Sequence, residues 1–331
     1  MRRALALFLI LGTSLAGCAK KELSAEEFSQ EVVRQFFLAE SGKSETELRA
    51  ELTSADGKSF QLTAAVDSRN DEYAAMKQEL ALDARAITEE NNEKQEVSGA
   101  LIVRFVDDEL FIQVKDFSAG APDPQSAALL ESFAGQWLKI PVADLPALLQ
   151  QKFPKEGKEK SRAKKEELAA HDWLKVRDDR GIDDAGRRVF EARLKTATLR
   201  QLIEEGAAEQ GATLPPDFAT KLGFLELLPY ELIIRADAET AEPQEISFTT
   251  RGELPNFAET AESSAAIEFS VELKTTFAEI NQPQEIKKPA DAVDLGALLS
   301  LFSMLSANEE GEMKLPSAAF PMEGLFAEKE E

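Results

Sequence analysis

Alternation of apolar and polar side chains is the dominant pattern in this chain, and it predicts a series of β-strands. The clearest case is IEFSVELKTTF at residues 267–277, where apolar or threonine side chains occupy every second position. A strand with this period turns one face to a core and the other to water, as in antiparallel sheets. Similar signals predict strands at residues 59–69, 77–88, 96–106, 109–117, 173–176, 187–195, 230–237 and 243–254, with a hairpin turn at Asp107-Asp108.

Apolar residues at helical spacing predict several helices between these strands. Ser24 and Glu27 have the spacing of a capping box, and the apolar residues that follow form one stripe, so we expect a helix at about 24–40. Further helical patterns occupy the middle of the chain, at residues 124–134, 143–153, 158–170, 196–210 and 215–228. Antiparallel strands interrupted by helices predict an α+β fold rather than alternating βαβ units.

The first residues have the anatomy of an export signal. Arg2 and Arg3 precede the unbroken apolar run 4–11, small residues follow, and charge returns at Lys20. A basic start, a short apolar core and small residues are typical of a cleaved signal peptide. The run is too short to span a membrane, which takes about 20 apolar residues. We therefore expect an exported protein.

The only cysteine, Cys18, lies directly after this apolar core. Together with Leu15, Ala16 and Gly17 it resembles the lipobox of bacterial lipoproteins. The resemblance implies cleavage before Cys18 and a diacylglycerol on its sulfur, with acyl chains such as palmitate anchoring the protein on the extracytoplasmic side of the cell membrane. The alternative is an ordinary secreted protein with a chance cysteine.

Charge narrows the choice of partners. The chain has 38 basic and 61 acidic residues and a net charge of −23. Phosphate binding needs a basic face, so this balance argues against nucleic acid. An acidic body is also repelled by anionic lipid, which fits attachment through an anchor rather than through charge. The one basic cluster, residues 155–167, is either a surface for anionic groups or a salt-bridged exposed helix, and pairs such as Arg162 with Glu166 favour the helix.

No pattern of catalytic or metal-binding residues emerges. His171 is the only histidine, and with Cys18 modified it cannot complete a His/Cys zinc set, so we expect a surface histidine at a helix-to-strand junction. The acidic residues in RDDRGIDDAGRR at 177–188 lack the spacing of an EF-hand loop, which favours a solvated hairpin turn. We therefore predict no enzyme, no cofactor and no metal.

Three longer stretches carry a family resemblance. QWLKIPVADLPALLQQ at 136–151, RRVFEARLKTATLRQLIEE at 187–205 and the stretch 267–295, which contains Asn281-Gln282-Pro283 and the element Ile286, Pro289, Asp291, Ala292, are similar to landmarks of the LolA/LolB/LppX-like lipoprotein-carrier superfamily. The resemblance covers most of residues 50–295. It implies a curved antiparallel half-barrel with helices packed on or closing its concave face, around an apolar cavity that in some members holds a lipid.

These observations predict four segments: a signal peptide at 1–17, a lipidated tether at 18–23, the α+β domain at 24–292, and a C-terminal helix with an acidic mobile tail at 293–331. Small residues on the apolar strand faces, such as Ala64, leave room for packed helices or for an apolar ligand. The candidate cavity-lining residues are Leu80, Leu82, Leu101, Val103, Ile267, Phe269 and Val271. The expected function is binding or carriage of a lipid or other apolar ligand, and the alternative is a non-catalytic structural or protein-interaction lipoprotein.

Overall fold

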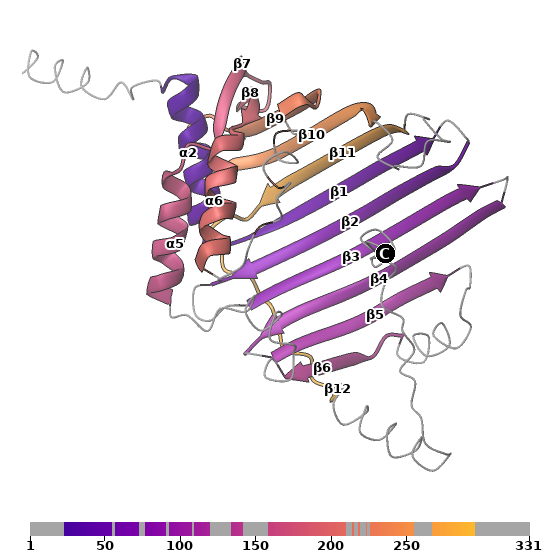
Figure 1. The fold of residues 1–331 in the computed structure, drawn as a ribbon. Coiled ribbons are helices and arrows are strands. Elements are labelled where there is room, and N and C mark those ends of the chain that lie inside the picture. Colours follow the sequence, from indigo (N-terminus) through magenta and orange to yellow (C-terminus); the bar gives the residue numbers. More distant parts are fainter. Residues whose placement is uncertain are drawn as a thin grey trace, which may run out of the picture.

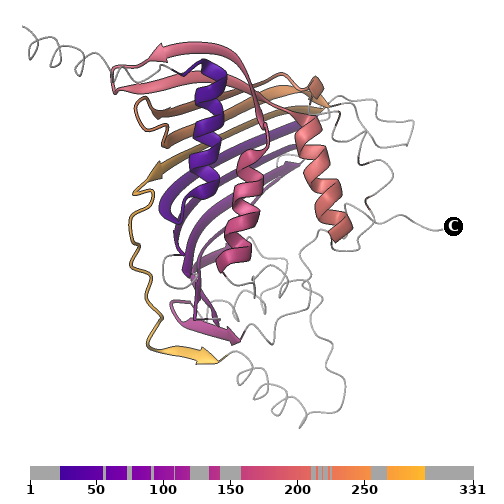
Figure 2. The same ribbon diagram turned by 90° about the vertical axis from the view of Figure 1, so that its left-hand side faces the viewer.

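The computed structural model describes residues 23–54, 57–72, 77–90, 93–107, 109–119, 134–141, 158–209, 214, 218, 223, 226–254 and 267–294. Within them the strands form one open sheet of twelve, in the order β12-β6-β5-β4-β3-β2-β1-β11-β10-β9-β8-β7 (Figure 1). The three helices of these described residues lie along one side of the sheet (Figures 1 and 2). The predicted α+β class with an antiparallel sheet is confirmed.

The helices are α2 (Ala25–Leu38), α5 (Lys158–Ala170) and α6 (Thr196–Glu209). The first strands are β1 (Ser41–Ser54), β2 (Ser59–Asp71), β3 (Lys77–Glu90), β4 (Glu93–Val106), β5 (Glu109–Ala119) and β6 (Trp137–Pro141). The remaining strands are β7 (Leu174–Ile182), β8 (Arg187–Leu194), β9 (Tyr230–Asp237), β10 (Pro243–Leu254), β11 (Ile267–Ala278) and β12 (Ala292–Asp294).

Two antiparallel meanders meet in the middle of the sheet. β1 to β6 follow one another, β7 to β11 do the same, and β1 pairs with β11 along their lengths, with Leu48 opposite Leu273. Only the short β12 pairs in parallel among these strands, alongside β6. Two strands that are more than two hundred residues apart in the sequence therefore lie side by side and join the halves into one sheet.

The sequence predicts most of these elements but misses β1 and the short strands β6 and β12. The capping box of α2 forms in both directions, with Ser24 Oγ accepting from the Glu27 N–H at 3.2 Å. The predicted turn at RDDRGIDDAGRR joins β7 to β8. β1 directly follows α2, and its outward positions are almost all charged, which masks the apolar alternation of its other face. The expected signal peptide, most of the tether, the helices at 124–134, 143–153 and most of 215–228, and the tail beyond 294 lie outside the described residues.

The core of the domain lies between α2 and the β7–β11 end of the sheet. Phe28 and Val32 of α2 pack on Phe190 of β8 and on Leu232 and Ile234 of β9, and all five side chains are buried. The rings of Phe28 and Phe190 meet edge to face, with centroids 6.2 Å apart. Apolar burial of this kind is the main stabilising term in folding. The i, i+4 spacing on α2 thus attaches the helix to the sheet.

Residues 279–291 connect β11 to β12 along the ends of the intervening strands (Figure 2). The Asn281 N–H donates to the Ser41 carbonyl at 2.9 Å, and farther on Ile286 is buried with Val106 and Phe111 in a second apolar cluster. The stretch that resembles the carrier superfamily therefore has a structural role here, because it ties the centre of the sheet to its far edge.

An ion-pair group lies beside that second cluster. Lys139, 2.6 Å away, and Lys288 both pair with the Glu109 carboxylate. The hydrogen bonds from Lys139 and Lys288 lower the pKa of Glu109 from its ordinary value, against the opposing effect of desolvation. Glu109 therefore stays charged and holds the 279–291 segment against β5 and β6.

Candidate functional site

One face of the sheet is largely apolar, although Asp179 and Arg188 lie on it at the β7–β8 edge. Because side chains alternate along each strand, the face that carries Phe269 on β11 can be followed from strand to strand through the register. On β1 to β5 we call this surface the β1–β5 apolar face. Its members are Leu48, Ala50, Leu52, Phe60, Leu62, Ala64, Val66, Leu80, Leu82, Ala84, Ala86, Val97, Gly99, Leu101, Val103, Ile112 and Val114.

The structure brings four of the predicted lining residues together. Leu82 lies opposite Leu101, and Leu80 lies opposite Val103, so these side chains form a block on β3 and β4. The other three predicted residues, Ile267, Phe269 and Val271, lie on β11. β1 and β2 separate the two groups, and Val271 and Phe269 sit at the other end of the strands. The predicted residues therefore share a face without forming one cluster.

Sequence reasoning misses the residues that connect these two groups. Leu48 and Leu52 belong to β1, a strand that the sequence pattern does not predict, and they bridge β11 to β2. The centre of the face is lined by small residues, because Ala64, Ala84 and Gly99 follow one another in register across β2, β3 and β4. The signal that could have found β1 is the alternation of Leu48, Ala50 and Leu52 with charged neighbours.

The two ends of this face differ in how much of their side-chain surface is exposed to solvent. At the helix-covered end Phe190 exposes 1 % of its surface, whereas Leu80 exposes 39 % and Val97 exposes 42 %. Phe277 and Phe269 of β11 each align with one residue on every strand from β1 to β4. Between these two lines of paired residues, the described side chains of this face on β1 to β4 carry no ionisable group. Such a surface offers no acid, base or nucleophile, and it holds a partner through burial of apolar area.

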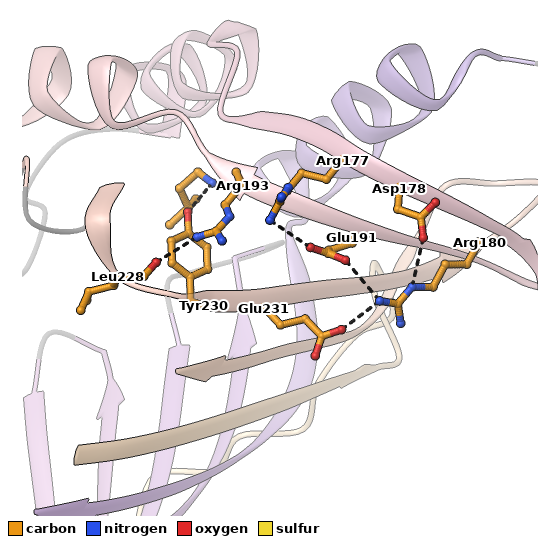
Figure 3. Close-up of polar contacts among 9 residues, drawn as sticks. Arg177, Asp178, Arg180, Glu191, Arg193, Leu228, Tyr230 and Glu231 are labelled. Atoms are coloured by element: carbon orange, nitrogen blue, oxygen red, sulfur yellow. Dashed lines mark hydrogen bonds and ion pairs between the residues drawn. The ribbon is translucent and has the colours of Figure 1, made fainter. Parts of the chain in front are cut away.

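The opposite face at the β7–β9 edge carries paired charges. Arg180 lies 2.9 Å from Glu231, 3.3 Å from Glu191 and 3.7 Å from Asp178, and Arg177 reaches Glu191 at 3.5 Å (Figure 3). The bonds to Glu231 and then Glu191 raise the pKa of Arg180 above its ordinary value. These side chains satisfy one another, which suits an edge strand that charges protect from pairing with other chains.

Next to this group, an aromatic ring fixes the end of β8. The guanidinium of Arg193 lies 3.9 Å from the centroid of the Tyr230 ring and donates to the Leu228 carbonyl at 3.2 Å. The Tyr230 hydroxyl accepts from the Leu194 N–H at 3.0 Å (Figure 3). Both contacts tie the end of β8 to β9 and to Leu228 just before it, so we assign them a structural role.

One group of metal-ligating side chains is present in the described part of the chain. Donor atoms of Glu167, His171 and Glu205 lie within 4.8 Å of one another, between the end of α5 and α6. His171 follows α5 directly, as predicted, and its ring meets Trp173 edge to face. One nitrogen and two carboxylates could ligate a divalent cation. Both glutamates are exposed, however, and Glu205 also accepts from Gln201 at 2.8 Å, so we assign the group no part in the function.

The remaining predictions on charged segments can be placed as well. Arg162 and Glu166 pair at 3.2 Å on α5, which confirms the salt-bridged helix expected there. Lys165 of the same helix reaches Glu72 at 2.7 Å and the Ala39 carbonyl at 3.1 Å, so it fixes α5 to the start of the sheet. No helix in the described residues is long and apolar enough to cross a membrane.

Comparison with known proteins does not assign this chain to a family. No family model and no curated protein sequence matches the chain. The fold defines a class in broad terms: an antiparallel sheet with helices at one end and an apolar face that extends beyond them.

Proposed function

We propose that the protein is a membrane-anchored extracytoplasmic lipoprotein that binds or carries a lipid or another apolar ligand on the β1–β5 apolar face. The observation that carries this proposal is the exposure of Leu80, Val97 and Leu52 on that face, against the burial of Phe190, Leu232 and Ile234 on the same face beneath α2. Monomeric soluble proteins rarely leave large contiguous apolar patches exposed, and such patches mark binding sites.

The width of the sheet, compared with the size of the helices, supports a ligand on the β1–β5 apolar face. Strands lie about 4.8 Å apart, so a twelve-stranded sheet is roughly 53 Å wide. The described helices run across the strands, and each is about 21 Å long at most, so none of them alone reaches across the whole sheet (Figure 2). An apolar ligand over the remaining strands would remove Leu80 and Val97 from water. The short side chains of Ala64 and Ala84 would let an acyl chain approach the strands there.

In this proposal the sheet acts as a half-barrel, with α2, α5 and α6 closing part of its concave face and the ligand occupying the rest. The apolar character of the face from β9 to β5 supports that arrangement, as does the sequence resemblance to the LolA/LolB/LppX-like carriers. The ligand is an acyl chain or similar apolar group, because the face offers apolar side chains and a few hydroxyls, such as Thr46 and Thr275, which already bond to each other at 3.0 Å.

The anchor is the second part of the proposal. Cys18 carries the lipid, and residues 18–23 form the tether to the domain. Two acyl chains give stable membrane attachment, since each buried CH₂ contributes about 0.8 kcal/mol. The protein acts as a binding protein and not as an enzyme, because the proposed site has no group that transfers a proton or attacks a bond.

Ligand binding is tested on the non-acylated protein that begins at residue 19. A fluorescent fatty acid is titrated, and native mass spectrometry detects lipid that co-purifies. Leu82→Glu places a charge on the β1–β5 apolar face, whereas Ala81→Glu places the same charge on the other face of the same strand. We expect Leu82→Glu to weaken uptake at least tenfold, and Ala81→Glu to bind as the parent does.

Two results would overturn ligand binding. One is a parent protein that neither takes up the probe nor co-purifies with lipid, which would favour the structural or protein-interaction alternative. The other is an equal loss of uptake in both variants when thermal unfolding shows that both are folded, because the effect would then not depend on the face.

The anchor is tested separately in the full-length protein. Cys18→Ser should abolish labelling by radioactive or alkyne-tagged palmitate and move the protein from the membrane fraction to the soluble fraction. Persistent labelling of Cys18→Ser would show that the lipobox interpretation is wrong, whatever the result of the ligand titration.

A further inference from the structure

The N-terminal end of the described chain is fixed to the β7–β8 hairpin. Arg188 on β8 donates from Nη1 to the Leu23 carbonyl at 2.9 Å, and its guanidinium lies 4.8 Å from the centroid of the Phe28 ring. Asp179 on β7 holds the other side of Arg188, with Nη2 and Oδ2 at 2.6 Å. The chain therefore leaves the domain at a defined place, beside the hairpin, where α2 begins (Figure 2).

The tether that leads from this place to the anchor is short. Five peptide units join Cys18 to Leu23, and a fully extended chain of that length reaches about 18 Å at most. When Cys18 carries a lipid, as the proposed function requires, Leu23 and the hairpin beside it must stay within that distance of the bilayer surface. The far edge of the sheet, at β12, is not held in this way.

The surface around Leu23 suits contact with lipid. Ile182 lies opposite Arg188 in the β7–β8 register and exposes 67 % of its surface, and Leu23 exposes 37 %. The hairpin 174–194 has six basic and five acidic residues, in a chain whose net charge is −23. An acidic surface is repelled by anionic headgroups, so this nearly neutral stretch can approach them at a lower electrostatic cost.

We propose that the β7–β8 hairpin, with Ile182 and Leu23, is the surface that rests on the phospholipid bilayer, and that the sheet extends away from it towards β12. This inference rests on the lipid anchor of the proposed function and adds an orientation to it. Five strand spacings separate β7 from β1, so the β1–β5 apolar face begins roughly 24 Å along the sheet from the membrane contact. The ligand face is then held in water above the bilayer.

Depth measurements on the full-length, lipidated protein test the orientation. The only native cysteine is Cys18, whose sulfur is occupied by the lipid in this proposal, so an introduced cysteine can be labelled alone. Ile182→Cys reports on the proposed contact surface. Val293→Cys is the matched control, since Val293 is another exposed apolar residue, on β12 at the opposite edge of the sheet. Each variant carries an environment-sensitive fluorophore and is reconstituted in phosphatidylcholine vesicles that contain brominated lipid.

The label at position 182 should be quenched severalfold more strongly than the label at position 293, with a blue-shifted emission. Equal and weak quenching at both positions, in protein that floats with the vesicles, would overturn the orientation and leave the anchor intact. Stronger quenching at position 293 would reverse the proposed orientation. Protein that fails to float at all, in the same way as Cys18→Ser, would overturn the anchor and the orientation with it.

Discussion

At the β7–β11 end of the sheet Phe190, Leu232 and Ile234 are buried beneath α2, whereas at the β1–β5 end Leu80 and Val97 expose over a third of their surface. Both ends belong to one apolar face, and the alternation of residues along the strands is similar in each. The difference arises from what lies over the strands. Alternation alone therefore establishes that a face is apolar, and only packing shows whether that face contributes to stability or remains open for a ligand.

The largest expected difference between the two ends is in the cost of truncating a core side chain. Phe190→Ala should lower the free energy of unfolding by about 3–5 kcal/mol, because the cavity forms beneath a helix that cannot collapse into it. Leu82→Ala, on the half-buried part of the face, should cost about 1–2 kcal/mol, since only part of its transfer free energy is lost. Urea denaturation followed by circular dichroism measures both.

The proposed difference between the two ends is wrong if Leu82→Ala lowers the free energy of unfolding as much as Phe190→Ala does, in protein stripped of lipid. That result would mean that the β1–β5 apolar face is filled by the chain's own side chains, and it would argue against a ligand there. As a control, the slope of the free energy of unfolding against urea concentration should be the same in both variants. Equal slopes show that both variants expose the same amount of surface on unfolding.

A ligand should stabilise the protein through the open end and not through the covered one. Ligand that binds only the folded state adds about 2.7 kcal/mol at a hundred times its dissociation constant. We expect a fatty acid to raise the Tm of the parent and of Ala81→Glu, and to leave the Tm of Leu82→Glu nearly unchanged. Differential scanning fluorimetry at several ligand concentrations checks this, and an equal rise in all three proteins would contradict it.

The sequence predicts the elements of both ends better than it predicts how they meet. The strand at 267–277 and the helix at 24–40 are visible because apolar spacing is a local property, and both occur nearly where expected. Pairing of β1 with β11 joins residues more than two hundred positions apart, so no local pattern encodes it. The sequence pattern does not reveal β1, because Glu47, Arg49 and Glu51 face water between its apolar positions.

The candidate site shows the same limit. Alternation identifies Leu82 and Leu101 as members of an apolar face, and their adjacency follows from the β3–β4 hairpin. Phe269 shares their apolar character, yet its distance from them across the sheet depends on the position of β1 and β2. Residue type therefore predicts which face a side chain occupies, whereas strand order decides which side chains share a site.

The covered end also contains a carboxylate, Asp179, whose contribution to stability should depend on acid pH. The hydrogen bond from Arg188, aided by the Gly181 N–H, lowers the pKa of Asp179 below its ordinary 3.8, against desolvation. The unfolded chain then takes up a proton before the folded one does. The stabilisation is present above pH 3.8 and is lost as pH falls from there through the lower folded-state pKa.

Asp179→Asn isolates this contribution. Discounted for the partial exposure of the pair, the loss at pH 7 should be about 1 kcal/mol, and the difference between variant and parent should shrink towards pH 3. Urea titrations at pH 7, 5 and 3 measure the difference. Asp178→Asn is the matched control, since Asp178 is more exposed and lies 3.7 Å from its arginine. A constant difference for Asp179→Asn across this range would show that the carboxylate is not held by Arg188.

The smallest effect concerns the first turn of α2, the helix that covers the β7–β11 end. Ser24→Ala removes the side-chain acceptor for the Glu27 N–H and should cost about 0.5–1 kcal/mol, whereas Ser24→Gly should cost only a few tenths, because glycine leaves that N–H open to water. Chemical denaturation of both variants, measured in parallel, distinguishes these two losses in the free energy of unfolding. Ligand uptake should be unchanged in both, since the cap lies at the covered end. Weaker uptake in Ser24→Ala would show that α2 also shapes the open face, and the two ends would then have to be treated as one coupled unit.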